Sequence, residues 1–127
     1  MDQQEHAYEN NSSIQEALLH YKEGVGRFTE QMPDIAHKYH SFTEACFEEG
    51  KLSKKEKQLI ALALSLNAQD EYCMIYHVKG CLDQGASREE ILEAVAVTGA
   101  FGGGHVLSQA VTLIEESMME LSGEYQS

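Results

Sequence analysis

A cysteine and a histidine four residues apart, Cys73 and His77, are the residues of this chain whose types and spacing best suit chemistry. Side chains at positions i and i+4 lie on the same face of a helix. A helix that starts after Asp70 and runs to about Gln84 would therefore bring the thiol and the imidazole together. Because imidazole can act as the base for a thiol and the thiolate is a nucleophile, the spacing indicates a nucleophilic or redox site.

Asp70 acts on this thiol in two opposing ways. As the N-cap of the expected helix it places Cys73 in the first turn, where the helix dipole and free amides favour a thiolate. The carboxylates of Asp70 and Glu71 oppose ionisation, because negative charge disfavours a second anion. A free thiol titrates near ~8.5, and we expect only a modest fall of the Cys73 pKa. Alternatively, Cys73 and His77 are packed core residues, since three cysteines and six histidines can produce one such pair by chance.

Cys81 extends the series by four more residues and raises the question of a metal site. Thiolate and imidazole suit zinc, with Zn–S bonds of about 2.3 Å. Eight residues of helix rise about 12 Å, so Cys73 and Cys81 cannot bind one ion from a straight helix. The same rise excludes a disulfide between them, which needs α-carbons within about 7 Å. We expect neither a metal nor a cofactor.

Helix signals follow one another along the chain and predict an all-α fold of about six helices, with no segment that alternates like a strand. Pro33 suits the first turn of a helix, and the glycines in residues 99–104 predict a tight joint before a last helix over 107–121. Capping boxes, in which a serine and a glutamate three residues later bond to each other's amides, begin at Ser13, Ser53 and Ser87.

The length of 127 residues and the 43% hydrophobic content fit one compact domain. We expect this domain over residues 12–122, between a disordered polar tail at 1–11 and a tail at 123–127. The run Leu59–Leu66 is apolar on nearly every side, which is typical of a helix buried all round. Cys46 lies in an apolar stripe and is expected in the core, since free cysteine is among the most buried residue types.

The charge and the cysteine count restrict the partners and the compartment. A formal charge of −12 argues against nucleic acids and anionic membranes, because both require a basic surface. The apolar runs are too short for a membrane span, and the first residues do not resemble a signal peptide. Three cysteines without framework spacing favour a reducing environment. We therefore expect a cytoplasmic protein without nucleic-acid or membrane partners.

From Lys51 to about Val111, about half of its length, the chain resembles the carboxymuconolactone decarboxylase family, in particular its alkylhydroperoxidase D-like (AhpD-like) branch. The resemblance is specific because three segments occur in the usual order and with the usual gaps. The resemblance implies an all-helical subunit that forms a homo-oligomer, a trimer or a hexamer, which would also cover the apolar helix. The three segments are Glu56–Leu62, Glu71–Lys79 and Gly85–Ile91.

In the peroxidase branch the motif is a glutamate followed by Cys-x-x-Cys-x-x-x-His. The two thiols form a disulfide while peroxide is reduced, and the glutamate and histidine relay protons. The resemblance assigns the second cysteine to Cys73 and the histidine to His77. Asp70 stands at the first cysteine and Gln58 at the glutamate. The local disulfide therefore cannot form, and Gln58 can hydrogen-bond but cannot shuttle a proton.

The resemblance favours a thiol-dependent, peroxiredoxin-type peroxidase with an antioxidant role. Cys73 would attack peroxide and become a sulfenic acid, with His77 as its base or orienting group. Asp70 would serve as a displaced proton relay or only as the N-cap. Cys46 or an external thiol reductant would then resolve the sulfenic acid.

Two other functions stay open. One is a lyase or isomerase of the decarboxylase branch that acts on a small acidic lactone and uses a histidine for proton transfer. Such an enzyme needs cations to hold a carboxylate, and Arg27 and Arg88 are the only arginines. The other is a non-catalytic oligomer with a degenerate site, which the replacements at positions 70 and 58 support. We rank the peroxidase first and the non-catalytic oligomer close behind.

Overall fold

The computed structural model describes residues 3–122, with side chains from residue 13 onward, and this part of the chain is all-helical. The expected fold class is thus confirmed, whereas the tail expected at 123–127 lies outside the described residues. The last three segments follow one another without a break and form one long helix, so residues 3–122 contain six helical units. The elements are α1 (Gln3–Gln31), α2 (Pro33–Phe47), α3 (Lys54–Asn67), α4 (Glu71–Asp83), α5 (Arg88–Gly102), α6 (Gly104–Gln109), the π-helical η1 (Ala110–Ile114) and α7 (Glu115–Ser122).

Most of the predicted helix starts are confirmed. The Ser53 hydroxyl accepts the amide of Glu56 while the Glu56 carboxylate accepts the amide of Ser53, and Ser87 and Glu90 do the same for α5. Pro33 is the first residue of α2. These pairs satisfy amides that would otherwise lack a partner at each helix start, so local sequence decides where α3 and α5 begin.

The first helix begins earlier than its sequence signal indicates. The capping box at Ser13 predicts a start there, but α1 is already helical from Gln3, so residues 3–11 continue the helix. The prediction of a start at Ser13 is therefore wrong. A 29-residue helix rises about 1.5 Å per residue, which is long enough for α1 to cross the helical body and extend beyond it.

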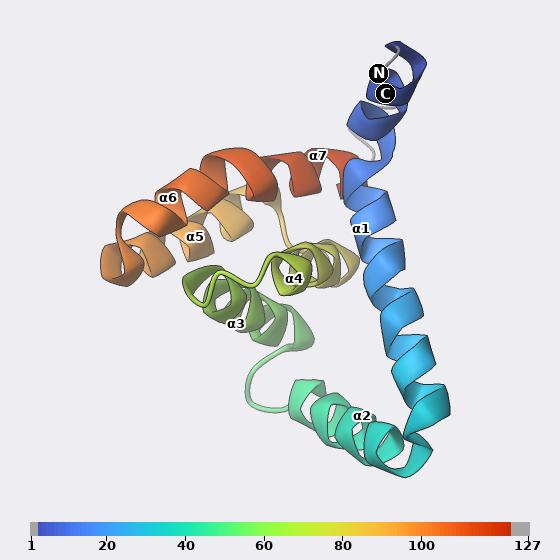
Figure 1. Ribbon diagram of the computed structural model, residues 1–127. Coiled ribbons are helices and arrows are strands. Elements are labelled where there is room, and N and C mark those ends of the chain that lie inside the picture. Colours follow the sequence, from blue (N-terminus) through green and yellow to red (C-terminus); the bar gives the residue numbers. More distant parts are fainter. Residues whose placement is uncertain (1–2, 123–127) are drawn as a thin grey trace.

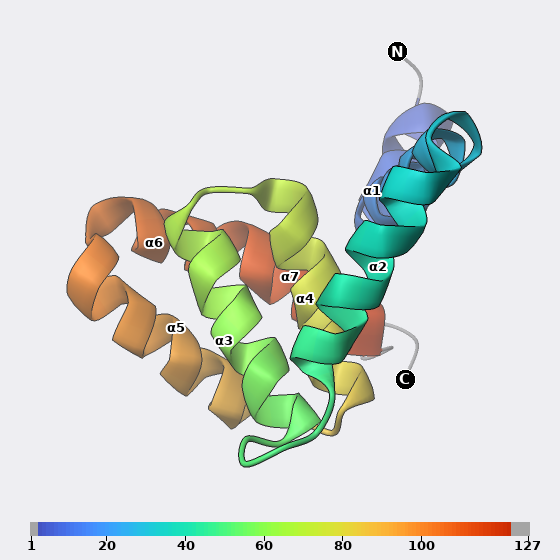
Figure 2. The ribbon, with the colours of Figure 1, turned by 90° about the horizontal axis from the view of Figure 1, so that it is seen from below.

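The core lies where α3 and α4 pack on each other, with α5 against α3 and α7 against α4. Figures 1 and 2 show α1 crossing the ends of this group and continuing with α2 as an arm beside it. No helix in the described residues is long and apolar enough to cross a membrane. The fully buried core side chains include Leu62, Leu66, Met74, Val78, Ile91, Ile114 and Met118.

A glycine joint turns the chain between α5 and α6, as the sequence predicts. Gly103 has φ = 79°, a conformation that residues with a Cβ rarely adopt. At Gly102 a Cβ would lie 2.8 Å from the Oδ1 atom of Asn67 and closer still to a methyl group of Val106, so a larger residue would force these side chains to move. The Nε2 atom of His105 lies 3.3 Å from the Asn67 carbonyl oxygen, which adds a polar contact to the joint.

Two burial predictions are wrong for the single chain. Helix α3 is not buried all round, because Ile60 and Leu64 are 47% and 66% exposed. Cys46 is exposed as well. Among the residues of α2, all of which the structure describes, only Ala36 is buried, because α2 contacts the body along one side. An apolar stripe in the sequence does not reveal whether a partner surface exists in the same chain.

Candidate active site

Cys73 and His77 line one cavity of about 560 Å³, so the structure places the two side chains of the sequence motif at a common site. Both come from the first half of α4. The carboxylate of Asp70 accepts the amide of Cys73 at 3.1 Å and caps the helix, which holds the cysteine in the first turn as expected. Helices α1, α2 and α3 supply the remaining walls. The site is thus formed where the α1–α2 arm faces the start of α4.

Gln58 of α3 fixes the imidazole of His77. Its Oε1 atom lies 2.9 Å from Nδ1 of His77, so Nδ1 carries the proton and donates, and Nε2 keeps the lone pair that a base needs. The Phe47 ring stacks on the imidazole, with centroids 5.8 Å apart and planes 13° apart. Burial lowers the pKa of His77, against a smaller opposing effect of the Asp70 charge. His77 is therefore a neutral base at neutral pH.

Gly80 makes room for this hydrogen bond. It lies one turn after His77, and a Cβ at this position would lie 2.5 Å from Cδ of Gln58. Since real Cβ contacts are longer, the glutamine amide could not keep its place beside a larger residue. The glycine therefore serves the Gln58–His77 pair rather than a turn of the backbone.

We expect Gly80→Ala to displace the Gln58 amide and to change the tautomer balance of His77, because the imidazole loses the partner that sets its tautomer. The loss of one side-chain hydrogen bond costs about 1 kcal/mol of unfolding free energy. NMR of the His77 ring nitrogens would show the change. Gly26→Ala is the control, since a Cβ there meets nothing within 4 Å; equal spectra for both variants would contradict the role given to Gly80.

The pKa of Cys73 is raised to about 11, so the modest fall expected from the sequence is wrong. Burial is the largest cause, followed by the hydrogen bond and the charge of Asp70. Together they outweigh the helix dipole. At neutral pH only about one thiol in ten thousand is ionised. The cysteine is thus a protonated thiol at neutral pH, and the neutral imidazole of His77 lines the same cavity.

Asp70→Asn is expected to lower the pKa of Cys73 and to speed its alkylation by iodoacetamide at neutral pH about tenfold, which corresponds to one pKa unit. The substitution removes the charge that opposes the thiolate, while asparagine caps a helix as well as aspartate. The rate is read from the Cys73 peptide by mass spectrometry. Circular dichroism should show unchanged helix content. An unchanged or slower alkylation rate would mean that Asp70 does not control this thiol.

The other two cysteines are not placed for a local redox cycle. Cys81 is fully buried, and burial raises its pKa to about 12. Cys46 is exposed and is not among the residues that line the Cys73 cavity. All three thiols are free. Within the described residues, no three histidine, cysteine, aspartate or glutamate side chains are grouped to hold a metal ion.

Helix α2 contributes side chains to the cavity that the sequence did not indicate. Its inner face brings His40, Glu44 and Phe47 to the cavity, and Lys22 comes from α1. Glu44 carries the one carboxylate among the described lining residues. The spacing of positions 40, 44 and 47 marks a common helix face, but the apolar stripe through Cys46 drew attention to a neighbouring face. Nothing local in the sequence shows which face of α2 meets α4.

Comparisons with known proteins agree with this architecture. Residues 33–116 match the sequence profile of the carboxymuconolactone decarboxylase family. An uncharacterised protein of the cox locus of Paracoccus denitrificans is 36% identical over 70 residues, which are 55% of this chain and 63% of that protein. The chain thus matches less than two thirds of the length of this relative.

Two solved structures share the fold. A family protein from Legionella pneumophila, in its apo form, superposes with a TM-score of 0.83 and is 29% identical, covering 87% of this chain and 98% of that one. A family protein from Thermotoga maritima, described as a candidate for an antioxidative response, has a TM-score of 0.64 and 29% identity over 71% of this chain and 92% of its own.

Proposed function

The chain belongs to the carboxymuconolactone decarboxylase family, and we propose that it is a thiol-dependent peroxidase with Cys73 as the nucleophile and His77 as its base. The observation that carries the proposal is the common cavity of these two residues, with His77 held by Gln58 so that Nε2 can accept a proton. The antioxidative response named for the Thermotoga relative supports the same class of reaction. Asp70 acts as the helix cap that tunes the thiol.

The proposed reaction takes one peroxide and two external thiols through three balanced steps. His77 removes the Cys73 proton, the sulfur attacks the outer peroxide oxygen, the O–O bond breaks, and His77 returns the proton to the departing alkoxide. Cys73 is then a sulfenic acid. An external thiol condenses with it and releases water, and a second external thiol cleaves this mixed disulfide. The peroxide is reduced to an alcohol, and the two thiols are oxidised to a disulfide.

The external thiol is part of the proposal because Cys46 does not line the Cys73 cavity. We accordingly place the protein in the cytoplasm, where thiol reductants are abundant. Peroxide loss should depend on added dithiothreitol and should be just as fast in Cys46→Ser. Turnover that stops in Cys46→Ser while excess thiol is present would identify Cys46 as the resolving residue and contradict this part of the proposal.

One observation favours a second candidate, a non-catalytic oligomer. A Cys73 pKa of about 11 leaves very little thiolate at neutral pH, which suits a degenerate site. Absence of peroxide turnover with dithiothreitol, glutathione and thioredoxin would select this candidate. A lyase that acts on an acidic lactone has less support, because such an enzyme needs cations to hold a carboxylate. Neither Arg27 nor Arg88 lines the Cys73 cavity, and among its described lining residues only Lys22 is a lysine or arginine.

We also propose that the protein is a homo-oligomer, a trimer or a hexamer, assembled through an apolar patch on α3, α5 and the last helix. Patches of this kind on soluble proteins mark interaction sites, and covering this one would bury the open face of α3. Its side chains are between 47% and 91% exposed in the single chain. They are Ile60, Leu64, Val97, Phe101, Leu107 and Val111.

Leu64→Glu is expected to dissociate the oligomer, because assembly would bury an unpaired charge at a cost of several kcal/mol. Size-exclusion chromatography with light scattering measures the mass directly. Leu19→Glu makes the same change at an exposed leucine of α1 outside the patch and should leave the mass unchanged. A monomeric parent protein would contradict the assembly.

A further inference from the structure

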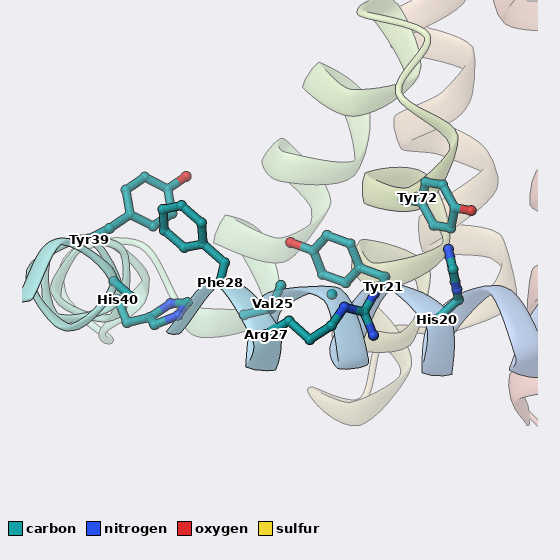
Figure 3. A pocket seen from close by; sticks show the side chains of 10 residues that line it. His20, Tyr21, Val25, Arg27, Phe28, Tyr39, His40 and Tyr72 are labelled. Carbon is teal, nitrogen blue, oxygen red and sulfur yellow. The ribbon is translucent and has the colours of Figure 1, made fainter. Parts of the chain in front are cut away.

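A second cavity, of about 430 Å³, adjoins the Cys73 cavity along the α1–α2 arm. Its volume is in the range typical of small-molecule sites. Figure 3 shows its side chains coming from both helices of the arm and from the start of α4. We refer to it as the arm groove. The residues that line both the arm groove and the Cys73 cavity are Tyr21, Val25, Tyr39 and His40.

The walls of the arm groove are mostly aromatic. Phe28 of α1 and Tyr39 of α2 both line the groove (Figure 3), and they are 47% and 62% exposed. Tyr21 stacks with Tyr72 at the other end, with centroids 6.3 Å apart. Rings left open to water in a groove favour an apolar ligand, because covering them removes apolar surface from solvent.

Arg27 gives this apolar groove a single strong cation. The chain has a formal charge of −12 and two arginines. Arg88 forms an ion pair with Glu115, whereas Arg27 forms none with any residue that the structure describes. Its side chain runs back along α1 toward Tyr21 and His20 (Figure 3), over Gly24, where a Cβ would lie 3.6 Å from the guanidinium. A guanidinium binds a carboxylate through two parallel hydrogen bonds.

We propose that the arm groove binds a monocarboxylate with an elongated apolar body, with the carboxylate on Arg27 and the body between the aromatic rings. The Arg27 guanidinium lies beside Gly24, which follows Tyr21 by three residues of α1. Tyr21 is one of the four residues that line both the arm groove and the Cys73 cavity, so an elongated body held at Arg27 can lie along the boundary between the two cavities. A medium-chain fatty acid has this chemistry.

The site is distinct from the features that define the family. Tyr21, Arg27 and Phe28 belong to α1, which precedes residues 33–116 that match the family profile. Binding in the groove requires no reaction at Cys73. If the proposed peroxidase function holds, a hydroperoxide of such an acid is the substrate that both cavities hold together, and this extension rests on that function.

The test is calorimetric titration of the full chain with decanoate, decanol and acetate, none of which carries a peroxide. We expect decanoate to bind at least about tenfold more tightly than decanol, in line with a charge-assisted pair, and acetate not to bind measurably. Equal affinities for decanoate and decanol, or binding of acetate alone, would overturn the proposal. So would the absence of decanoate binding in an oligomer that covers the groove.

Arg27→Gln locates the carboxylate. It should weaken decanoate binding about tenfold and leave decanol binding unchanged. Lys38→Gln is the matched control, because it removes one positive charge from exposed α2 outside both cavities. Equal losses in the two variants would assign the effect to overall charge and contradict the site. Phe28→Ala should weaken decanoate and decanol binding alike.

The Cys73→Ser variant separates this proposal from the proposed function. Decanoate should bind this variant with the affinity of the parent chain, because the cysteine does not line the arm groove. If the parent chain binds decanoate but shows no peroxide turnover, the proposed ligand site stands and the proposed peroxidase function is wrong. If it shows peroxide turnover but does not bind decanoate, the peroxidase function stands and the proposed ligand site is wrong.

Discussion

Replacing Cys73 by serine is expected to reduce thiol-dependent peroxide consumption at least about a thousandfold, because removing the nucleophile of a covalent mechanism removes the reaction step itself. Serine keeps the size of the side chain, so the cavity and the helix start should persist. The assay follows peroxide loss with dithiothreitol in excess. Helix content and unfolding temperature, measured by circular dichroism, show whether the variant is folded.

The matched controls are the other two thiols. Cys46→Ser should retain full activity, since this cysteine is exposed outside the cavity. Cys81→Ser alters the core, where the side chain is fully buried, and should lower stability rather than the activity of the folded fraction. Residual turnover of more than a few per cent in a folded Cys73→Ser variant would show that a group other than Cys73 is the nucleophile.

His77→Asn is expected to lower the rate about a hundredfold or more, which is the usual contribution of a general base. The asparagine amide can still donate to Gln58, so the substitution removes the proton acceptor while it keeps the contact with α3. In this variant only preformed thiolate reacts. Its rate should therefore rise about tenfold per pH unit toward the Cys73 pKa of about 11.

The parent protein should instead show a rate that changes little with pH near neutrality. Burial lowers the pKa of His77 below its ordinary value of 6.5. The base is then neutral at pH 7, and activity should decline only as the pH falls through this lowered pKa. Identical pH profiles for the parent chain and His77→Asn would show that His77 does not take the proton.

Local signals explain how much of the fold the sequence could predict. Ser53 and Ser87 determine the starts of α3 and α5 through bonds to residues three positions away, and Asp70 does so for α4. Such contacts lie within one helical turn and can be predicted from the sequence without a structure. The start of α1 at Gln3 could not be predicted in this way, because the capping sequence at Ser13 lies inside the helix.

The sequence could predict only part of the candidate site, because some of its contacts lie within one helix and others join different helices. Cys73 and His77 share a face of one helix, so their proximity follows from spacing, whereas the cavity that they line also requires α1, α2 and α3. The bond from His77 to Gln58 joins α4 to α3; the resemblance only assigned Gln58 to the same motif as His77 and did not predict this bond. Phe47 and Glu44 reach the cavity because α2 folds back over α4, which is a long-range event. The pKa of Cys73 depends on burial, which spacing does not reveal.

The proposed function requires that peroxide oxidises Cys73 to a sulfenic acid, and trapping this sulfenic acid tests that step. The protein is treated with one equivalent of peroxide together with dimedone, a reagent for sulfenic acids, and the labelled peptides are identified by mass spectrometry. We expect label on Cys73 and little on Cys46 or Cys81. Label on Cys46 with none on Cys73, or no label at any peroxide concentration, would contradict it.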